Sequence, residues 1–178
     1  MNRYLRLLIL VGLFLLVGCS AAPVEQNLVG AGAPSPQAVV ESFLEDLNHA
    51  LGDAKLAQTE VRQLWAERLA GHFAPSERVD QRTAMADLLD GFATSAAKPA
   101  LGSKATLEIT YRGTEVLEQR EGRALVRVVD GVFTLRFLDT QGVLVRERTG
   151  SLSKVLGQTS GGLPTLQVGG SWFMTEGF

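Results

Sequence analysis

The chain has 178 residues, of which 46% are hydrophobic and 20% are charged, and its formal net charge is −2. This length suits one well-buried domain and is short for two. A near-neutral charge without a concentrated basic run argues against a protein that binds nucleic acid electrostatically. The arginines between residues 104 and 154 alternate with acidic residues, so we expect a solvated sheet face of mixed charge. Because the chain has one cysteine, an intramolecular disulfide is excluded and packing alone must stabilise the fold.

The N-terminus has the pattern of a secretory signal. Arg3 and Arg6 precede an apolar run from Leu7 to Val17 that only Gly12 interrupts. As a helix, this run of about 11 residues would rise roughly 16 Å, against roughly 30 Å for a bilayer core. A cleaved signal is therefore favoured over a permanent transmembrane helix.

The apolar run ends in the stretch LVGCS, residues 16–20, which resembles the lipobox of bacterial lipoproteins. The resemblance implies that the Cys19 thiol receives a diacylglyceryl group, that the signal is cut before Cys19, and that the new amine is acylated. Two or three acyl chains would hold the protein on a membrane essentially permanently. Ser20, in place of aspartate, is similar to the pattern of lipoproteins released to an outer membrane. The alternatives are a free thiol at the end of an uncleaved anchor and an unrelated cysteine in a plain signal peptide.

These features divide the chain into a signal peptide over residues 1–18, a lipidated cysteine with a flexible linker over 19–34, and one α+β domain over 35–178. The linker is rich in small, turn-prone residues and has no sustained period. As a coil it would span roughly 20 Å, so the domain could stand off the lipid surface. We expect an exported protein, lipid-anchored to the cell membrane or the outer membrane and facing the periplasm or the exterior.

Three helical patterns open the domain. The first is predicted to begin with Ser35 as N-cap and Pro36 as the first helical residue. Its apolar face consists of Val39, Val40, Phe43, Leu44, Leu47, Ala50, Leu51 and Ala54. The second pattern, ending near residue 74, uses Val61, Leu64, Trp65, Arg68, Leu69 and Phe73. The third runs from about residue 79 to just before Lys98.

Glu45, Asp46 and His49 lie within one turn of the first helix, an arrangement that could serve a metal or acid–base chemistry. No second cluster of ligands supports a metal site, so we predict a solvated helix face and no metal or cofactor. His72 is interpreted as a residue at a helix C-terminus, where the helix dipole favours it, rather than as a catalytic base.

After Gly102 the hydrophobic period changes from 3.6 to 2, which predicts strands over residues 106–112 and 114–119 with a bulge at Gly113. Two alternating runs, 123–129 and 132–138, flank Asp130-Gly131, the typical signal of a two-residue hairpin. The predicted register places Val129 opposite Val132. It also places six side chains on one buried face: Ala124, Val126, Val128, Phe133, Leu135 and Phe137. Further strands are expected through residues 143–148, up to the Gly169-Gly170 turn, and over 171–174.

This order of elements resembles the nuclear transport factor two-like (cystatin-like) superfamily. The stretches that carry the resemblance are 39–47 (VVESFLEDL), 65–74 (WAERLAGHFA) and 169–173 (GGSWF). It implies N-terminal helices packed on a curved antiparallel sheet in a cone-shaped α+β domain, as in bacterial lipoproteins of similar plan. Some members are enzymes with a carboxylate base in the cavity. The corresponding residues here would be Asp46, His49, Asp87, Asp90 and Tyr111, none of which matches a family motif residue by residue.

Our leading hypothesis is a non-enzymatic binding or assembly module, tethered through Cys19, that uses the concave sheet face for an envelope protein or a small apolar ligand. The first alternative is a small cavity enzyme of the isomerase or hydrolase type, which requires a buried carboxyl group with a raised pKa beside a donor. The second is a structural envelope protein, with a homodimer formed through the sheet. No catalytic residue is assigned, and no nucleic-acid partner is expected.

The lipobox resemblance predicts that Cys19→Ala abolishes lipid labelling, because the thiol is the acceptor of the diacylglyceryl group. The measurement is incorporation of labelled palmitate into the full chain expressed in a bacterium that processes lipoproteins. Ser20→Ala, which keeps the thiol and a small neighbour, serves as the control and should label normally. Labelling of the Cys19→Ala protein would refute the anchor.

Overall fold

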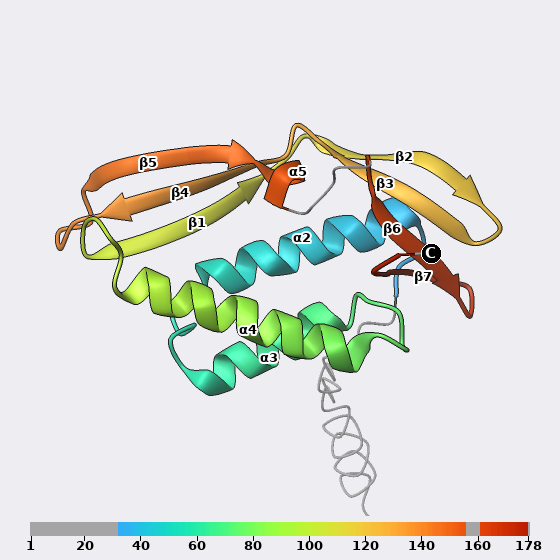
Figure 1. Cartoon of the computed structure of the whole chain (residues 1–178), viewed down its shortest axis with the longest axis horizontal. Coiled ribbons are helices and arrows are strands. Elements are labelled where there is room, and N and C mark those ends of the chain that lie inside the picture. Colours follow the sequence, from blue (N-terminus) through green and yellow to red (C-terminus); the bar gives the residue numbers. More distant parts are fainter. Residues whose placement is uncertain (1–31, 156–160, 178) are drawn as a thin grey trace, which may run out of the picture.

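The structure, a computed structural model, describes residues 32–155 and 161–177. The predicted signal peptide, Cys19 and nearly all of the linker lie outside the described residues. The described part has an α+β fold with two antiparallel sheets (Figure 1). The helices are α2 (Pro36–Gly52), α3 (Thr59–Ala70), α4 (Arg78–Ala97) and the short α5 (Leu152–Val155). The strands are β1 (Lys104–Thr110), β2 (Gly113–Arg120), β3 (Arg123–Val129), β4 (Val132–Leu138), β5 (Leu144–Ser151), β6 (Leu163–Val168) and β7 (Ser171–Met174).

Helix α2 is the centre of the core. It begins as the sequence predicts, with the Ser35 hydroxyl accepting a hydrogen bond from the amide of Ala38 at 3.1 Å and Pro36 in the first turn. All of its predicted apolar face is buried except Ala54, which lies beyond the helix end. In Figure 1 this helix lies between the strands on one side and α3 and α4 on the other. Strands from both sheets therefore share one hydrophobic core with it.

Helices α3 and α4 form the outer layer. Helix α3 ends at Ala70, four residues before the predicted position, and Phe73 is buried in the segment that follows. Leu64, predicted to face the core, is 59% exposed because α3 turns that side to solvent. Helix α4 covers the predicted range and buries Leu89 completely.

The spans of β3 and β4 are confirmed, but the predicted hairpin between them is wrong. Strand β3 pairs with β2 and β6, whereas β4 pairs with β1 and β5. Asp130-Gly131 is instead a corner at which the chain passes from one sheet to the other. The hairpin turn is Glu121-Gly122, where both residues have positive φ, 48° and 75°. These angles are those of the primed turn that suits the twist of a two-residue hairpin.

One register runs through the corner. Thr110 of β1 pairs with Val132 of β4, and three residues further on Gly113 of β2 pairs with Val129 of β3. The two long strands, β1–β2 and β3–β4, therefore form one antiparallel ribbon that bends between the two sheets. Arg112 donates its amide to the carbonyl of Val129 at 3.0 Å, which maintains pairing across the bend.

Asp130-Gly131 fails as a hairpin for identifiable reasons. Gly131 does not have the positive φ that the second residue of such a turn requires. A Cβ at Gly131 would lie 3.0 Å from the Cβ of Leu152, and the Leu152 amide donates to the Gly131 carbonyl at 2.9 Å. The glycine thus serves the close approach of α5. The predicted inner face of β3 is nevertheless correct, since Ala124, Val126 and Val128 are all buried.

The C-terminal strands complete the second sheet. Strand β6 pairs with β3 and β7, and β6 turns into β7 through Gly169 and Gly170, as predicted. Ala33 exchanges backbone hydrogen bonds with Trp172 of β7 at 2.9 and 2.8 Å. Residue 33 belongs to the predicted linker, so part of that linker pairs with the sheet.

A glycine with positive φ in a turn and a glycine in the interior of a helix should respond oppositely to substitution by alanine. Gly122→Ala should lower the free energy of unfolding by about 1 kcal/mol, because alanine at positive φ is strained while its Cβ would meet nothing closer than 3.5 Å. Gly91→Ala, in the interior of α4 with nothing within 4 Å, should raise that free energy by up to about 1 kcal/mol. Urea unfolding of both variants checks this, and an unaffected Gly122→Ala protein would contradict the turn assignment.

Candidate functional site

A largely apolar hollow lies between the C-terminal end of α4 and the sheet β1-β4-β5. We call it the α4–sheet groove. Its volume is about 550 Å³, within the range of small-molecule sites. Its lining comprises Gly91, Phe92, Ser95, Ala96, Lys98, Pro99, Ala100, Ala105, Leu107, Leu135 and Phe137. Lys98 is the one ionisable residue in this lining.

The floor of the groove follows from the pairing of β1 with β4. Ala105 lies opposite Phe137, and Leu107 lies opposite Leu135, so their side chains share one face of the sheet. Phe92 of α4, which also lines the groove, packs against the main core. Figure 1 shows this end of α4 below β1, joined to it by residues 98–103. The floor is therefore an extension of the core that α4 leaves partly uncovered.

Strand β5 continues the same face beyond the groove. Arg146 pairs with Phe137, and Arg148 pairs with Leu135, so both arginines project on the side of the apolar floor. Both are exposed. Within residues 32–155 and 161–177, neither arginine forms an ion pair.

The opposite face of this sheet is charge-balanced. Arg136 contacts Glu108 at 2.6 Å on one side and Glu147 at 2.8 Å on the other. Hydrogen bonds to both carboxylates raise the pKa of Arg136 above its ordinary value. This face is the solvated mixed-charge surface that the sequence predicts. The two faces of one sheet thus differ in charge.

The one buried carboxylate among the described helices is Asp46, which the sequence analysis placed on a solvated face. This expectation is wrong, since Asp46 is only 6% exposed. Both of its oxygens bind Arg68 of α3, at 2.7 and 2.8 Å, and one also contacts His72 Nε2 at 2.8 Å. Asp46 points inward because it lies three residues after Phe43 and four before Ala50, on the buried side of α2.

The Asp46 cluster is a structural link between α2 and α3. Burial raises the pKa of Asp46, but hydrogen bonds and positive charge from Arg68 and His72 lower it by more, so the pKa lies below the ordinary 3.8. The hydrogen bond to Asp46 in turn raises the pKa of Arg68. A carboxylate held ionised by a bidentate arginine is a poor proton acceptor. His72, predicted to lie at a helix end, follows the C-cap Gly71 of α3 and has its ring edge-on to Phe43, with the ring centroids 6.1 Å apart.

A second link lies beside this cluster. Trp65 donates its indole N–H to Asp53 at 2.8 Å, and the Arg68 guanidinium lies 5.5 Å from the Trp65 ring centroid. The hydrogen bonds from Trp65 and from the Lys55 amide lower the pKa of Asp53. The polar groups of α2 and α3 therefore satisfy one another.

The other residues considered for catalysis do not come together around a cavity. His49, Glu45 and Asp87 are exposed. Asp90 is also exposed and pairs with Arg62 at 2.9 Å. No group of three or more His, Cys, Asp or Glu side chains in the described part of the chain is placed to hold a metal ion.

Tyr111 lies half-buried at the corner of the ribbon. Burial, then the nearby charges of Glu41 and Glu45, raise the pKa of its phenol. Thr114, also near the corner, donates its hydroxyl to Glu41 at 2.6 Å, and Asn48 accepts the amide of Ile109 at 2.9 Å. Side chains of α2 thus secure the bend.

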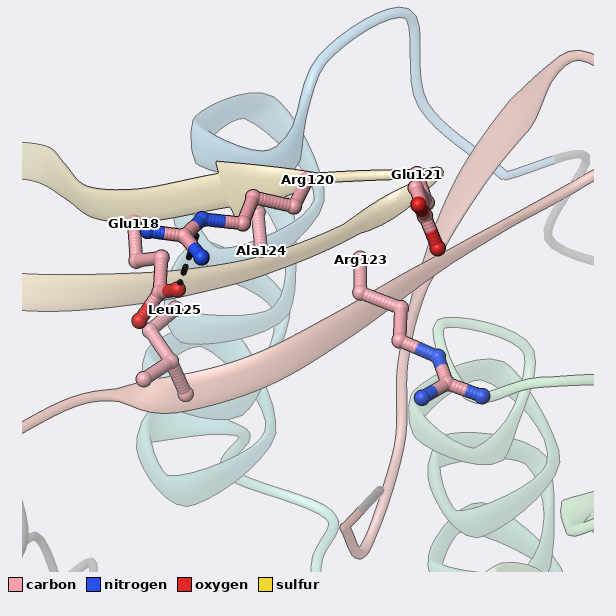
Figure 2. A pocket seen from close by; sticks show the side chains of 6 residues that line it. All are labelled: Glu118, Arg120, Glu121, Arg123, Ala124 and Leu125. Atoms are coloured by element: carbon pink, nitrogen blue, oxygen red, sulfur yellow. Dashed lines mark ion pairs between the residues drawn. The ribbon is translucent and has the colours of Figure 1, made fainter.

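Two further hollows are less suited to a ligand. One, of about 240 Å³ at the β2–β3 turn, is lined by Glu118, Arg120, Glu121 and Arg123 together with Ala124 and Leu125 (Figure 2). Its charges balance, and Arg120 pairs with Glu118 at 3.2 Å. The other, of about 700 Å³, lies between α3 and α4, and an ion pair between Arg82 and Glu67 crosses it. We call the latter the α3–α4 hollow.

The α4–sheet groove was not predictable from the sequence. Its walls come from the end of α4, the connection to β1 and the inner face of β1 and β4, which are joined only by long-range pairing. The sequence did contain one indication of the charge beside the groove. Arg146 and Arg148 alternate with Glu147, so both arginines lie on one face once the strand is assigned.

No protein-family model matches the chain, and neither does any protein with a curated function. Over residues 32–155 and 161–177, none of the helices combines the length and apolar character needed to cross a membrane.

The Asp46 cluster predicts that Asp46→Asn lowers the free energy of unfolding by about 2 kcal/mol near neutral pH, because Arg68 and His72 lose the carboxylate that they bind. The loss is moderate because water can reach the half-exposed Arg68 in the variant. A carboxyl whose folded pKa is lowered stabilises the protein above about pH 3.8, and this contribution disappears as pH falls through the folded pKa. The difference between wild type and variant should therefore shrink below that pH. Urea unfolding across pH, with exposed Glu45→Gln as control, measures it, and a variant as stable as wild type at neutral pH would contradict the link.

Proposed function

We propose that the protein is a lipid-anchored module of the bacterial cell envelope whose α4–sheet groove binds a small apolar ligand without transforming it. The observation that carries this proposal is the groove itself. Its lining is almost entirely apolar, its volume is about 550 Å³, and Lys98 is its one ionisable residue. Sites that bind without catalysis need shape and apolar surface more than convergent acid and base groups.

The anchor and the tether belong to the same proposal. Cys19 would hold the protein on the cell membrane or outer membrane, and the linker would let the domain reach ligands near the lipid surface. We further propose that the domain is nuclear transport factor two-like. Support comes from three helices that precede a bent antiparallel ribbon and from the C-terminal β7 strand with Trp172.

The alternative of a cavity enzyme has less support. It requires a buried carboxyl group with a raised pKa in an apolar pocket, whereas the pKa of buried Asp46 is lowered by its partners. The alternative of a structural protein that dimerises through its sheet would use an edge strand, of which β5 is the most exposed. That edge carries alternating charges, which disfavour edge-to-edge pairing.

Ligand binding in the groove can be tested with 1-dodecanol as a neutral alkyl probe. The protein for this test is the chain from residue 19 to 178 carrying Cys19→Ser, which includes every described residue and needs no detergent. Binding to the folded state alone should raise the thermal unfolding midpoint in proportion to the logarithm of probe concentration. Ala100→Trp, which fills the groove from an exposed position, should abolish the rise.

The matched control is Thr83→Trp, which fills the α3–α4 hollow from an equally exposed position. It should leave the rise unchanged. A wild-type midpoint that does not respond to the probe, or a response that Thr83→Trp removes and Ala100→Trp leaves intact, would refute the groove as the site.

A further inference from the structure

We infer that the ligand of the α4–sheet groove is a single-chain amphiphile with an anionic head, of the free fatty acid class, whose head binds Arg146 and Arg148. This inference rests on the proposed function and adds the chemical class of the ligand. Its basis is the position of two arginines beside an apolar floor.

The register of β5 fixes the side on which these arginines project. Directly opposed residues of antiparallel strands share a face, and Arg146 and Arg148 are opposed to Phe137 and Leu135 of the floor. Neighbouring strands lie about 4.8 Å apart, so each guanidinium begins one strand away from the apolar surface. A ligand chain over β1 and β4 would reach the arginines with its end.

Within the described strands β1, β4 and β5, no acidic residue lies on the same face as Arg146 and Arg148. The acidic residue between the two arginines, Glu147, binds Arg136 on the opposite face at 2.8 Å. Asp139, in the β4–β5 turn, accepts the amides of Gln141 and Val143 at 2.8 Å. The groove lining contains no aspartate or glutamate among the described residues. An anion is therefore the partner that this face lacks.

Three other exposed arginines in or next to the strands form ion pairs with acidic residues. Arg112 pairs with Asp130 at 3.2 Å, Arg120 pairs with Glu118 at 3.2 Å, and Arg127 pairs with Glu115. Lys98 lies at the C-cap of α4, where its charge offsets the negative end of the helix dipole. Arg146 and Arg148 thus supply the uncompensated charge beside the groove.

The apolar floor and the paired arginines together select the ligand class. A chain alone would leave the arginines without a partner, and an anion without a chain would leave the floor exposed. Two guanidinium groups two residues apart on the same strand face can bind one carboxylate with charge-assisted hydrogen bonds. Because the two arginines together bind one head, we expect one amphiphile per protein.

Dodecanoate, 1-dodecanol and dodecyltrimethylammonium, which share a chain and differ in head, test the inference by calorimetric titration into the same 19–178 chain. Dodecanoate should bind at least about tenfold more tightly than dodecanol, a factor that corresponds to about 1.4 kcal/mol. The cation should bind most weakly. Arg146→Gln combined with Arg148→Gln should remove the preference for dodecanoate and leave dodecanol binding unchanged.

The matched control is Arg112→Gln combined with Arg120→Gln, which changes the net charge equally at exposed sites away from the groove. It should keep the preference for dodecanoate. Between about 0.01 M and 1 M salt the affinity for dodecanoate should fall while that for dodecanol stays constant, because the arginines are exposed and screened.

The outcomes separate this inference from the function on which it rests. If neither probe binds, or if Ala100→Trp affects neither, the groove is not a ligand site and both proposals fail. If dodecanol binds as tightly as dodecanoate, the groove holds neutral ligands and only this inference fails. A third outcome concerns phosphatidylglycerol vesicles. If vesicle binding requires the arginines, and Ala100→Trp changes neither vesicle binding nor dodecanoate binding, then the arginines serve a membrane surface. That result would overturn the inference.

Discussion

The fold depends on one continuous ladder of strand pairing that bends at Asp130-Gly131. The register persists across the bend, which keeps the two long strands paired on both sides of it. On one side of the bend β1 and β4 form a sheet with β5, and on the other side β2 and β3 form a sheet with β6 and β7. Both sheets still pack on α2, whose side chains at Asn48 and Glu41 bind the strands near the corner. Helix α4 then covers only part of the β1–β4 face, and the uncovered part is the α4–sheet groove.

Charge in this protein is used for two different purposes. The buried carboxylate of Asp46 is fully engaged by Arg68 and His72 and joins the helices. Such a buried group is stabilising only while every partner is present, so it constrains the fold and is unsuited to exchanging protons. Arg146 and Arg148 show the opposite condition, since they are exposed, uncompensated and adjacent to apolar surface. The two arginines are therefore better suited to bind a ligand than the buried cluster.

Local features were predictable from the sequence and long-range features were not. The N-cap at Ser35, the apolar face of α2 and the spans of β3 and β4 follow from capping and periodicity, which act over a few residues. The hairpin at Asp130-Gly131 was mispredicted because a two-residue signal cannot show that Leu152 occupies the space beside Gly131. Asp46 was predicted to lie on a solvated face, although its spacing from Phe43 and Ala50 places it on the buried side of α2. The groove had no comparable signal, since its walls meet only in the folded chain.

The most direct test of the central claim, that the α4–sheet groove is a ligand site, is amide chemical-shift mapping of the 19–178 chain during titration with dodecanoate. We predict saturable shifts at Ala96 of α4 and Ala100 of the connection to β1, at Leu107 and Leu135 of the floor, and at Arg146 and Arg148. Shifts confined to the α3–α4 hollow or to the β2–β3 turn, or no saturable shifts, would contradict it.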